Sequence, residues 1–448
     1  MADNRDTNAR PDEWDMTGVR DDSAAHAHER SHDLPERKRH HSSGSGSRRR
    51  RRRRTVKSFV RSHRWTIVNI AVVIFFSIAI VVLLTDETAK RADLVQTIEM
   101  ASLETDTARL DTVSVGDGIS FSAPYFESDP VLICDAAMAY LNGNEDRLAV
   151  HEENVDPTDE ERPVTLRFSL VVPDGLSVEG YTVEVSENSD FSDARVIGLT
   201  GLYRSTEVNY LKTDTAYFYR ITAALSDGGA TAVTGSFRTA DTPRILSIDG
   251  LSNVRDIGGW KTEGGSELRQ GSIIRGSEAV YRSDESEARA ESMALLGFRT
   301  ELDLREGEGS AAEVFETDIQ HLHCEAPLLS ECYSAEGMEA VRAVISVLSD
   351  EENYPIYVHC TDGVERTGTV CCLLEAFLGM EREDIVMEYA LSSPYEAEAL
   401  EAEAAALLDG LNAYEGTTLS QRAESYLLAC GLTDPQLQSI RDILLSGQ

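Results

Sequence analysis

The sequence predicts two folded domains on a membrane tether: one transmembrane helix, then an all-β sandwich, then an α/β domain. Three observations lead to this fold class. Residues 65–84 carry no charge, and residues 163–239 alternate between apolar and polar side chains in short runs. Residues 359–368 form a glycine-containing decapeptide between an apolar strand and an apolar helix, an arrangement typical of an α/β domain.

Residues 1–64 are predicted to be a disordered basic tail. They are poor in apolar side chains and contain the linker-like Gly44-Ser45-Gly46. They carry 17 lysines and arginines against 10 acidic residues, whereas the remainder of the chain carries 25 against 68. The acidic remainder should repel nucleic acid. The arginine run Arg48–Arg54 has no interleaved aromatic residues, so a contact with anionic lipid is favoured and no nucleic-acid partner is expected.

The run Trp65–Leu84 is predicted to be a retained transmembrane helix. About 20 residues, at about 1.5 Å each, cross the ~30 Å hydrocarbon core. A buried core helix rarely runs this long without polar interruption, and a signal peptide would lie nearer the start and end in small residues. The arginines on its N-terminal side predict a single-pass cell-membrane protein with a cytoplasmic N-terminus and extracellular C-terminal domains.

Residues 85–160 are predicted to be a stalk followed by a β-containing segment without a domain assignment. Asp86–Glu104 has the spacing of a helix that continues out of the membrane. Ile119–Phe121 and Val131–Ile133 are strand-like pieces broken by polar runs.

Residues 161–240 are predicted to form the sandwich. Strand patterns span Thr165–Val171, Tyr181–Val185, Ala216–Ala223 and Thr234–Phe237, with Asp227-Gly228-Gly229 as a hairpin turn. Short strands at this spacing are typical of an immunoglobulin-like β-sandwich. The run from Leu211 to Arg220 resembles the L-x-x-x-T-x-Y-x-Y-R stretch of fibronectin type III domains, and its aromatic residues are interpreted as sandwich packing. The expected role is a spacer or weak adhesion module.

The decapeptide His359–Gly368 reads H-C-T-D-G-V-E-R-T-G. It lies between the predicted strand Tyr354–Val358 and the predicted helix Thr369–Leu378. A cysteine six residues before an arginine, with glycines between and after, is the layout of a loop that wraps a phosphate. Backbone N–H groups and a helix N-terminus face the anion, and the arginine grips two oxygens. The same field favours the thiolate form of Cys360, which is the nucleophilic form.

This loop is similar to the signature of cysteine-dependent tyrosine and dual-specificity phosphatases. Further blocks resemble the bacterial branch of that family, which includes lipid-directed members, and they occur in its order: Asn253–Gly259, Gly271–Ser277, Leu296–Arg305, Ile385–Ser392 and Tyr426–Leu445. The resemblance covers residues 246–448. It implies a phosphatase domain with a central sheet flanked by helices, active as a protein-tyrosine phosphatase-type phosphomonoesterase without a cofactor.

The loop and one of the other blocks depart from that branch at several positions. Val364 and Glu365 stand where the branch commonly has lysine and aspartate, and Asp362 adds a negative charge. Gly276 also separates Arg275 from Ser277, which usually form a pair. Loss of the lysine removes a cation that would hold a second phosphate or an inositol ring. A singly phosphorylated phenol is therefore the expected substrate, with inositol phosphates and phosphoinositides as the alternative.

The resemblance implies a role for each residue of the site. Cys360 is the nucleophile and Arg366 stabilises the equatorial oxygens. The general acid is Glu365 or Asp303, with Glu365 favoured because it lies in the loop. Asp303 could instead be a structural partner of an arginine such as Arg255, and Asp256 has a similar structural alternative. His359 orients the loop, and Thr367 is placed to bond the sulfur. The remaining phosphate-contacting positions are Thr361, Asp362, Gly363, Val364 and Gly368, and the remaining loop-supporting ones are Asn253, Arg255 and Asp256.

The seven cysteines form no disulfide framework, and free thiols or one or two bridges are both compatible with their scatter. His321, His323 and Cys324 raise the alternative of a zinc site, but a hydrogen-bonded pair of histidines at a strand edge is favoured, so no metal is predicted. The expected partner is a phosphorylated protein or small phosphomonoester. A rival class is an inactive module that binds phosphorylated ligands at the cell surface; the retained Cys360–Arg366 pair favours the enzyme. The oligomeric state is not predicted.

Overall fold

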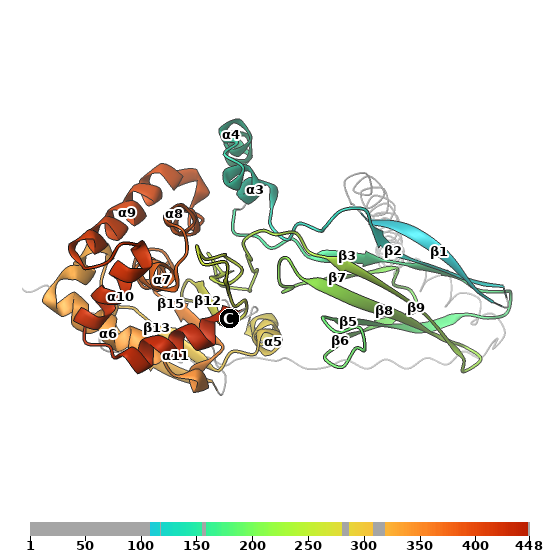
Figure 1. Ribbon diagram of the computed structural model, residues 1–448. Helices are drawn as coiled ribbons and strands as arrows, with labels where there is room; N and C mark the ends of the chain where they lie inside the picture. The colour runs from blue at the N-terminus through green and yellow to red at the C-terminus, as the bar shows by residue number, and fades with distance from the viewer. Residues whose placement is uncertain (1–107, 117, 155–157, 280–285, 308–318, 447–448) are drawn as a thin grey trace, which may run out of the picture. The chain divides into compact units, whose positions relative to one another are not determined.

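The computed structural model describes residues 108–116, 118–154, 158–279, 286–307 and 319–446 (Figure 1). All of them belong to one compact unit, Glu99–Gln448. The predicted basic tail, the span Trp65–Leu84 and the stalk Asp86–Glu104 lie outside the described residues. Within those residues, no helix is both long enough and apolar enough to cross a membrane.

The N-terminal half of the described chain forms antiparallel sheets. Four strands pair in the order β6-β5-β8-β9, and two smaller sheets have the orders β1-β2-β4 and β3-β7. The strands are β1 (Ala108–Gly116), β2 (Ile119–Phe126), β3 (Val164–Arg167), β4 (Ser169–Val171), β5 (Val178–Ser186), β6 (Arg195–Thr200), β7 (Ser205–Val208), β8 (Ala216–Leu225) and β9 (Ala230–Arg238). The strands predicted from alternating residues are therefore confirmed, and β8 and β9 join at the predicted turn.

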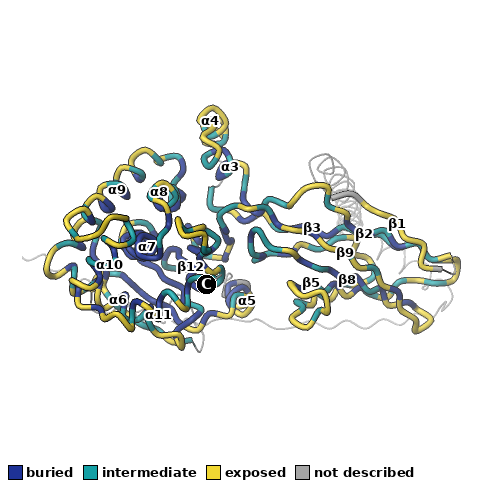
Figure 2. The backbone as a smooth tube through the Cα atoms, viewed as in Figure 1, coloured by how far each residue is buried: buried dark blue, intermediate teal, exposed yellow. Residues whose placement is uncertain are grey.

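These sheets share one hydrophobic core. Side chains of β8 alternate between buried and less buried positions, so that Tyr219 and Ile221 pack with Leu166, Val183 and Phe121 from other strands. Figure 2 shows the buried positions as dark segments along the strands. The sandwich begins at β1, before the predicted boundary at residue 161, because β1 pairs with β2 and β2 pairs with β4. Assignment to the fibronectin type III class stays a prediction.

The segment between β2 and β3 differs from the prediction. Val131–Ile133 is not a strand: Ile133 makes only one isolated bridge, to Glu161. Two short helices follow, α3 (Asp135–Leu141) and α4 (Glu145–Glu153). Ile133 instead packs with Ala137 and Ile245 in a small core of its own, which explains its apolar character.

The C-terminal half is an α/β domain built on a five-stranded sheet of order β10-β12-β15-β13-β14. The strands are β10 (Arg255–Asp256), β12 (Ile273–Gly276), β13 (Thr300–Asp303), β14 (Gln320–His323) and β15 (Ile356–His359). β12, β15, β13 and β14 are parallel, and β10 is antiparallel to β12. A separate short pair joins β11 (Glu267–Leu268) to β16 (Leu445–Ser446).

Helices cover both faces of this sheet, as the resemblance implies. Alternate residues of β15 enter different cores: Ile356 and Val358 join the larger one, and Tyr357 packs with Met293 of α5 in the smaller one. The helices are α5 (Ser286–Leu296), α6 (Ala335–Leu348), α7 (Glu365–Leu378), α8 (Arg382–Ala390), α9 (Ala397–Gly410), α10 (Leu419–Ala429) and α11 (Asp434–Leu444), with short 3₁₀ turns η1 (Leu329–Tyr333), η2 (Glu351–Asn353), η3 (Pro394–Glu396) and η4 (Leu411–Ala413). Helix α7 is buried along almost its whole length, so it is the central helix of the domain.

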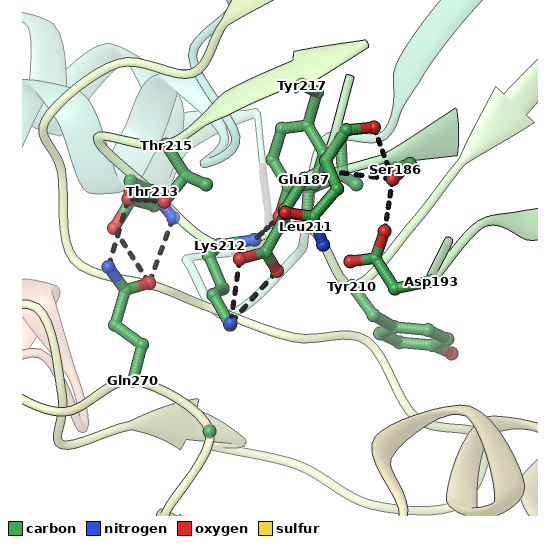
Figure 3. A network of polar contacts seen from close by, with 12 residues as sticks. Ser186, Glu187, Asp193, Tyr210, Leu211, Lys212, Thr213, Thr215, Tyr217 and Gln270 are labelled. Atoms are coloured by element: carbon green, nitrogen blue, oxygen red, sulfur yellow. Dashed lines mark hydrogen bonds and ion pairs between the residues drawn. The ribbon is translucent and has the colours of Figure 1, made fainter. Parts of the chain in front are cut away.

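Hydrogen bonds join the sandwich to the α/β domain. Gln270 donates to the carbonyl of Thr213 and accepts from its N–H, both at 2.9 Å (Figure 3). Buried Arg244 donates to the carbonyls of Tyr210 and Leu211 and pairs with Asp256 at 2.7 Å. Asp256 also accepts from the N–H groups of residues 258 and 271, and none of its hydrogen bonds within the described residues goes to the predicted phosphate loop. Asp256 is therefore a structural partner of an arginine, Arg244, which was the alternative role predicted for it.

Candidate active site

The predicted loop connects β15 to α7, at the carboxyl ends of parallel strands. The predicted strand and helix on its two sides are both confirmed. His359, the last residue of β15, stands opposite Gly276 of β12 and Asp303 of β13. Ligands of open α/β sheets bind at this edge. The sheet therefore places Cys360 where a ligand site is expected.

Donors from neighbouring segments hold the loop's carbonyl groups, and two of them, Asn253 and Arg275, are buried. The carbonyl of Thr361 accepts from the N–H of Glu278 at 3.0 Å. The Asn253 side chain donates to the carbonyls of Asp362 and Gly363 at 3.2 and 3.1 Å, and Arg275 donates to that of Gly363 at 2.8 Å. Asn253 has a φ of +56°, a left-handed conformation that asparagine tolerates better than most residues.

The loop's N–H groups, in contrast, are available. Within the described part of the chain, the backbone N–H groups of residues 361–367 donate no hydrogen bond. Some of them form the N-terminus of α7, where an anion is stabilised by the unpaired N–H groups and the helix dipole. Gly363 has a φ of +70°, and a Cβ there would clash with the carbonyl of Gly276. The loop is thus shaped as a cradle for an anion, and it needs glycine at this position.

Arg366 lines a cavity of about 710 Å³ beside the loop. Its side chain is 19% exposed and pairs with Glu306 at 3.0 Å. Cys360 is buried, with 5% of its surface exposed. Glu306 directly follows the predicted Leu296–Arg305 block. The sequence reasoning missed it, because its partner lies 60 residues away.

His359 contacts the loop and a buried carboxylate. Its Nδ1 lies 3.1 Å from the carbonyl oxygen of Cys360, and its Nε2 lies 3.0 Å from Glu301. The other Glu301 oxygen lies 3.0 Å from Nδ1 of His321. His359 is therefore fixed from both sides. Glu301 was not identified from the sequence, although it precedes Asp303 on β13 by two residues.

A buried ionic network contacts the residues that hold the loop. Glu388 of α8 pairs with Arg255 at 2.7 Å and with Arg275 at 2.6 Å. Arg255 also donates to the backbone and side-chain oxygens of Asn253, and Arg275 reaches the carbonyls of Gly363 and Val364. Burial alone would raise the pKa of Glu388, but the two arginines hold that pKa below its ordinary value. The network connects α8 with the two residues that orient the loop.

The two candidates for the general acid have different surroundings. Asp303 is buried and accepts from Nε and NH2 of Arg305 at 2.9 and 2.8 Å, and from the Arg305 N–H at 2.9 Å. These donors stabilise its charged form, and the pairing raises the pKa of Arg305. The partner arginine is thus Arg305, not Arg255. Glu365 is exposed at the first turn of α7, and the described residues offer its carboxylate no hydrogen bond. Glu365 is therefore the better placed of the two.

The remaining predicted positions lie in or next to the loop. Thr361 and Asp362 are exposed, and Val364 packs partly against the larger core. Thr367 is buried, and its hydroxyl has no hydrogen-bond partner among the described residues, Cys360 included. Gly368 faces the ring of Tyr389, with which a Cβ would clash. The bond between Thr367 and sulfur stays a prediction.

None of the described cysteines forms a disulfide, and burial raises the pKa of Cys371 and Cys332 to about 12 and of Cys430 to about 11. These buried thiols are poor nucleophiles near neutral pH. His323 lies 2.8 Å from the carbonyl of Arg305 and is held at the edge of the sheet. Among the described residues, no group of His, Cys, Asp and Glu is arranged to hold a metal ion.

Residues 246–446 match the model of the tyrosine phosphatase family. The chain is 29% identical over 181 residues to a Cupriavidus necator protein named as a tyrosine-protein phosphatase; the match covers 34% of this chain and 64% of that protein's length. A crystal structure of the core catalytic domain of the PP-IP phosphatase SIW14 from S. cerevisiae is 16% identical, with a TM-score of 0.26, over 40% of this chain and 88% of that one. A Neisseria meningitidis phosphatase structure is 18% identical, with a TM-score of 0.20, over 30% and 93%. The family match and the named relative agree with the predicted enzyme class, a phosphatase of the tyrosine phosphatase type, over the α/β domain.

Proposed function

We propose that the α/β domain hydrolyses phosphomonoesters through a phosphocysteine on Cys360. The observation that carries this proposal is the loop of residues 360–366, whose carbonyl groups are held by buried donors while its N–H groups are unpaired beside a cysteine and an arginine. That arrangement suits the three equatorial oxygens of a phosphoryl group, and charge stabilisation of this kind supplies most of the rate enhancement in phosphoryl transfer.

In the proposed reaction, the Cys360 thiolate attacks phosphorus and forms a sulfur–phosphorus bond. The bond between phosphorus and the leaving oxygen breaks, and Glu365 gives its proton to that oxygen. Water then attacks phosphorus, Glu365 takes a proton from it, and the sulfur–phosphorus bond breaks to give inorganic phosphate and the thiolate. Arg366 moves from Glu306 to the phosphoryl oxygens, because a doubly charged phosphate is the stronger partner.

The proposed substrate is a singly phosphorylated phenol such as phosphotyrosine. Val364 supplies no cation, and Asp362 adds an exposed negative charge beside the cradle. Multiply charged head groups therefore lose an attraction that a lysine would provide. We expect the full chain, with a chelator present, to hydrolyse para-nitrophenyl phosphate and to prefer phosphotyrosine peptides over inositol polyphosphates and phosphoinositides in kcat/KM.

Replacement of Val364 by lysine should narrow that preference, because it restores a cation beside the cradle. The measurement is kcat/KM on the three substrate classes for both proteins at one ionic strength. A wild-type kcat/KM about tenfold higher for an inositol substrate than for the phosphotyrosine peptide, about 1.4 kcal/mol in the transition state, would contradict the substrate proposal. No turnover of any substrate, combined with phosphate binding, would instead favour the inactive binding module.

The proposed location is the cell membrane, with the sandwich and the phosphatase domain outside and the sandwich acting as a spacer. Support comes from the uncharged run Trp65–Leu84 and the arginines before it. Protease added to intact cells should remove the C-terminal domains and spare a tag at the N-terminus. Protection of the C-terminal domains would overturn this orientation and place the substrates in the cytoplasm.

A further inference from the structure

The cavity beside Arg366 has a strongly acidic wall. Four glutamates line it, and Arg366 is its one basic lining residue among those described. The glutamates are Glu306, Glu325, Glu331 and Glu336, and the other lining residues are Ala326, Pro327, Leu328, Ser334, Gly337 and Ala340. The volume of about 710 Å³ is in the range of pockets that hold a small organic ligand. A substrate whose phosphate reaches Arg366 therefore extends along carboxylates.

Among the described lining residues, the one cation already has an acidic partner. Arg366 pairs with Glu306 at 3.0 Å, so a phosphate that takes Arg366 leaves the Glu306 carboxylate without that partner. Glu325 accepts the N–H of Gly307 at 2.9 Å and stays next to Glu306. Phosphate binding thus increases the unbalanced negative charge of the wall. A positive charge on the substrate itself would restore the balance.

The backbone fixes the far part of the wall. Glu331 lies in η1 and Glu336 in the first turn of α6, whose N-terminus is capped by Ser334 through the N–H of Gly337 at 3.0 Å. A Cβ on Gly337 would clash with the carbonyl of Glu331, so glycine allows the two segments to pack closely. Both carboxylates are therefore held on the wall by short, well-anchored backbone segments.

We infer that this site selects phosphotyrosine peptides in which lysine or arginine flanks the phosphotyrosine. The inference rests on the proposed phosphatase function and names its substrate class more narrowly. The phosphate occupies the loop and Arg366, and the flanking cations pair with the glutamates of the cavity wall. Acidic flanks meet the same carboxylates and are repelled. Each exposed pair contributes little, but several act together on one substrate.

The test compares kcat/KM of the full chain on three phosphotyrosine peptides of equal length, with lysine, serine or glutamate beside the phosphotyrosine. The lysine peptide should exceed the glutamate peptide by about tenfold at low salt, and the ratio should shrink as ionic strength rises. The double variant Glu331→Gln, Glu336→Gln should reduce the ratio to about threefold or less, because two wall carboxylates are removed.

A matched control comes from the same helix. Glu339→Gln removes a carboxylate of α6 that does not line the cavity and is 79% exposed, so the ratio should stay at its wild-type value. An equal fall in both variants would show that only the net charge of the domain matters, and a glutamate peptide that matches the lysine peptide would overturn the inference. Hydrolysis of para-nitrophenyl phosphate by the wild type separates failure of this inference from failure of the proposed function. If the wild type hydrolyses it but shows no peptide preference, only the inference is wrong. If the wild type does not hydrolyse it, the proposed function is wrong.

Discussion

Replacement of Cys360 by serine is expected to abolish turnover while leaving anion binding measurable. The variant removes the nucleophile, which should cost at least about a thousandfold in kcat. The cradle survives, because its shape depends on Asn253, Arg275 and the backbone, and none of their bonds uses the sulfur. The measurements are the hydrolysis rate of para-nitrophenyl phosphate and the binding of phosphate or vanadate.

The matched control for this variant is Cys134→Ser. Cys134 is a half-buried cysteine that precedes α3, outside the α/β domain, and its replacement should leave the rate unchanged. A Cys360→Ser protein that keeps more than about a tenth of the wild-type rate would contradict the covalent mechanism, since no other described thiol lies in the loop.

The Glu388→Gln variant should show the largest loss of stability. Glu388 is buried between Arg255 and Arg275, and without its charge two guanidinium groups stay buried and uncompensated. Breaking a buried pair in this way costs about 3–5 kcal/mol. Urea unfolding of the α/β domain should show the loss, and turnover should fall too, because both arginines also hold the loop. Glu383→Gln, an exposed change on the same helix, should have little effect on either measurement.

The same pairing predicts a pH dependence. The arginines hold the pKa of Glu388 below its ordinary value in the folded state, so its contribution is present at neutral pH and is lost as pH falls toward that lowered pKa. The wild type should therefore lose its stability advantage over Glu388→Gln on acidification. An advantage that stays constant down to strongly acidic pH would show that the ion pairs do not carry it.

Local patterns predicted the loop and its flanking elements. The decapeptide contains its own turn glycine, cysteine and arginine, and the apolar runs on either side define β15 and α7. Alternation likewise identified β8 and β9. The strand prediction for Val131–Ile133 was wrong, because three consecutive apolar residues can pack in a small core beside a helix as well as form a strand.

The supporting residues depend on contacts that no local pattern contains. Glu388 meets Arg255 across 133 residues, and Glu301 meets His359 across 58. Spacing along the chain does not reveal which of many glutamates makes such a contact. Asp303 shows the opposite case: its partner Arg305 is only two residues away, yet the sequence left the pairing open because a catalytic and a structural carboxylate look alike there.

The most direct test of the central claim is to trap the covalent intermediate. The full chain is mixed with a radiolabelled aryl phosphate, quenched in acid during the first turnovers, and digested for peptide mapping. The label is predicted on the peptide that contains Cys360, and it should be missing from the Cys360→Ser protein treated in the same way. Steady turnover with label on a different residue, or with equal labelling of the Cys360→Ser protein, would contradict a phosphocysteine at this loop.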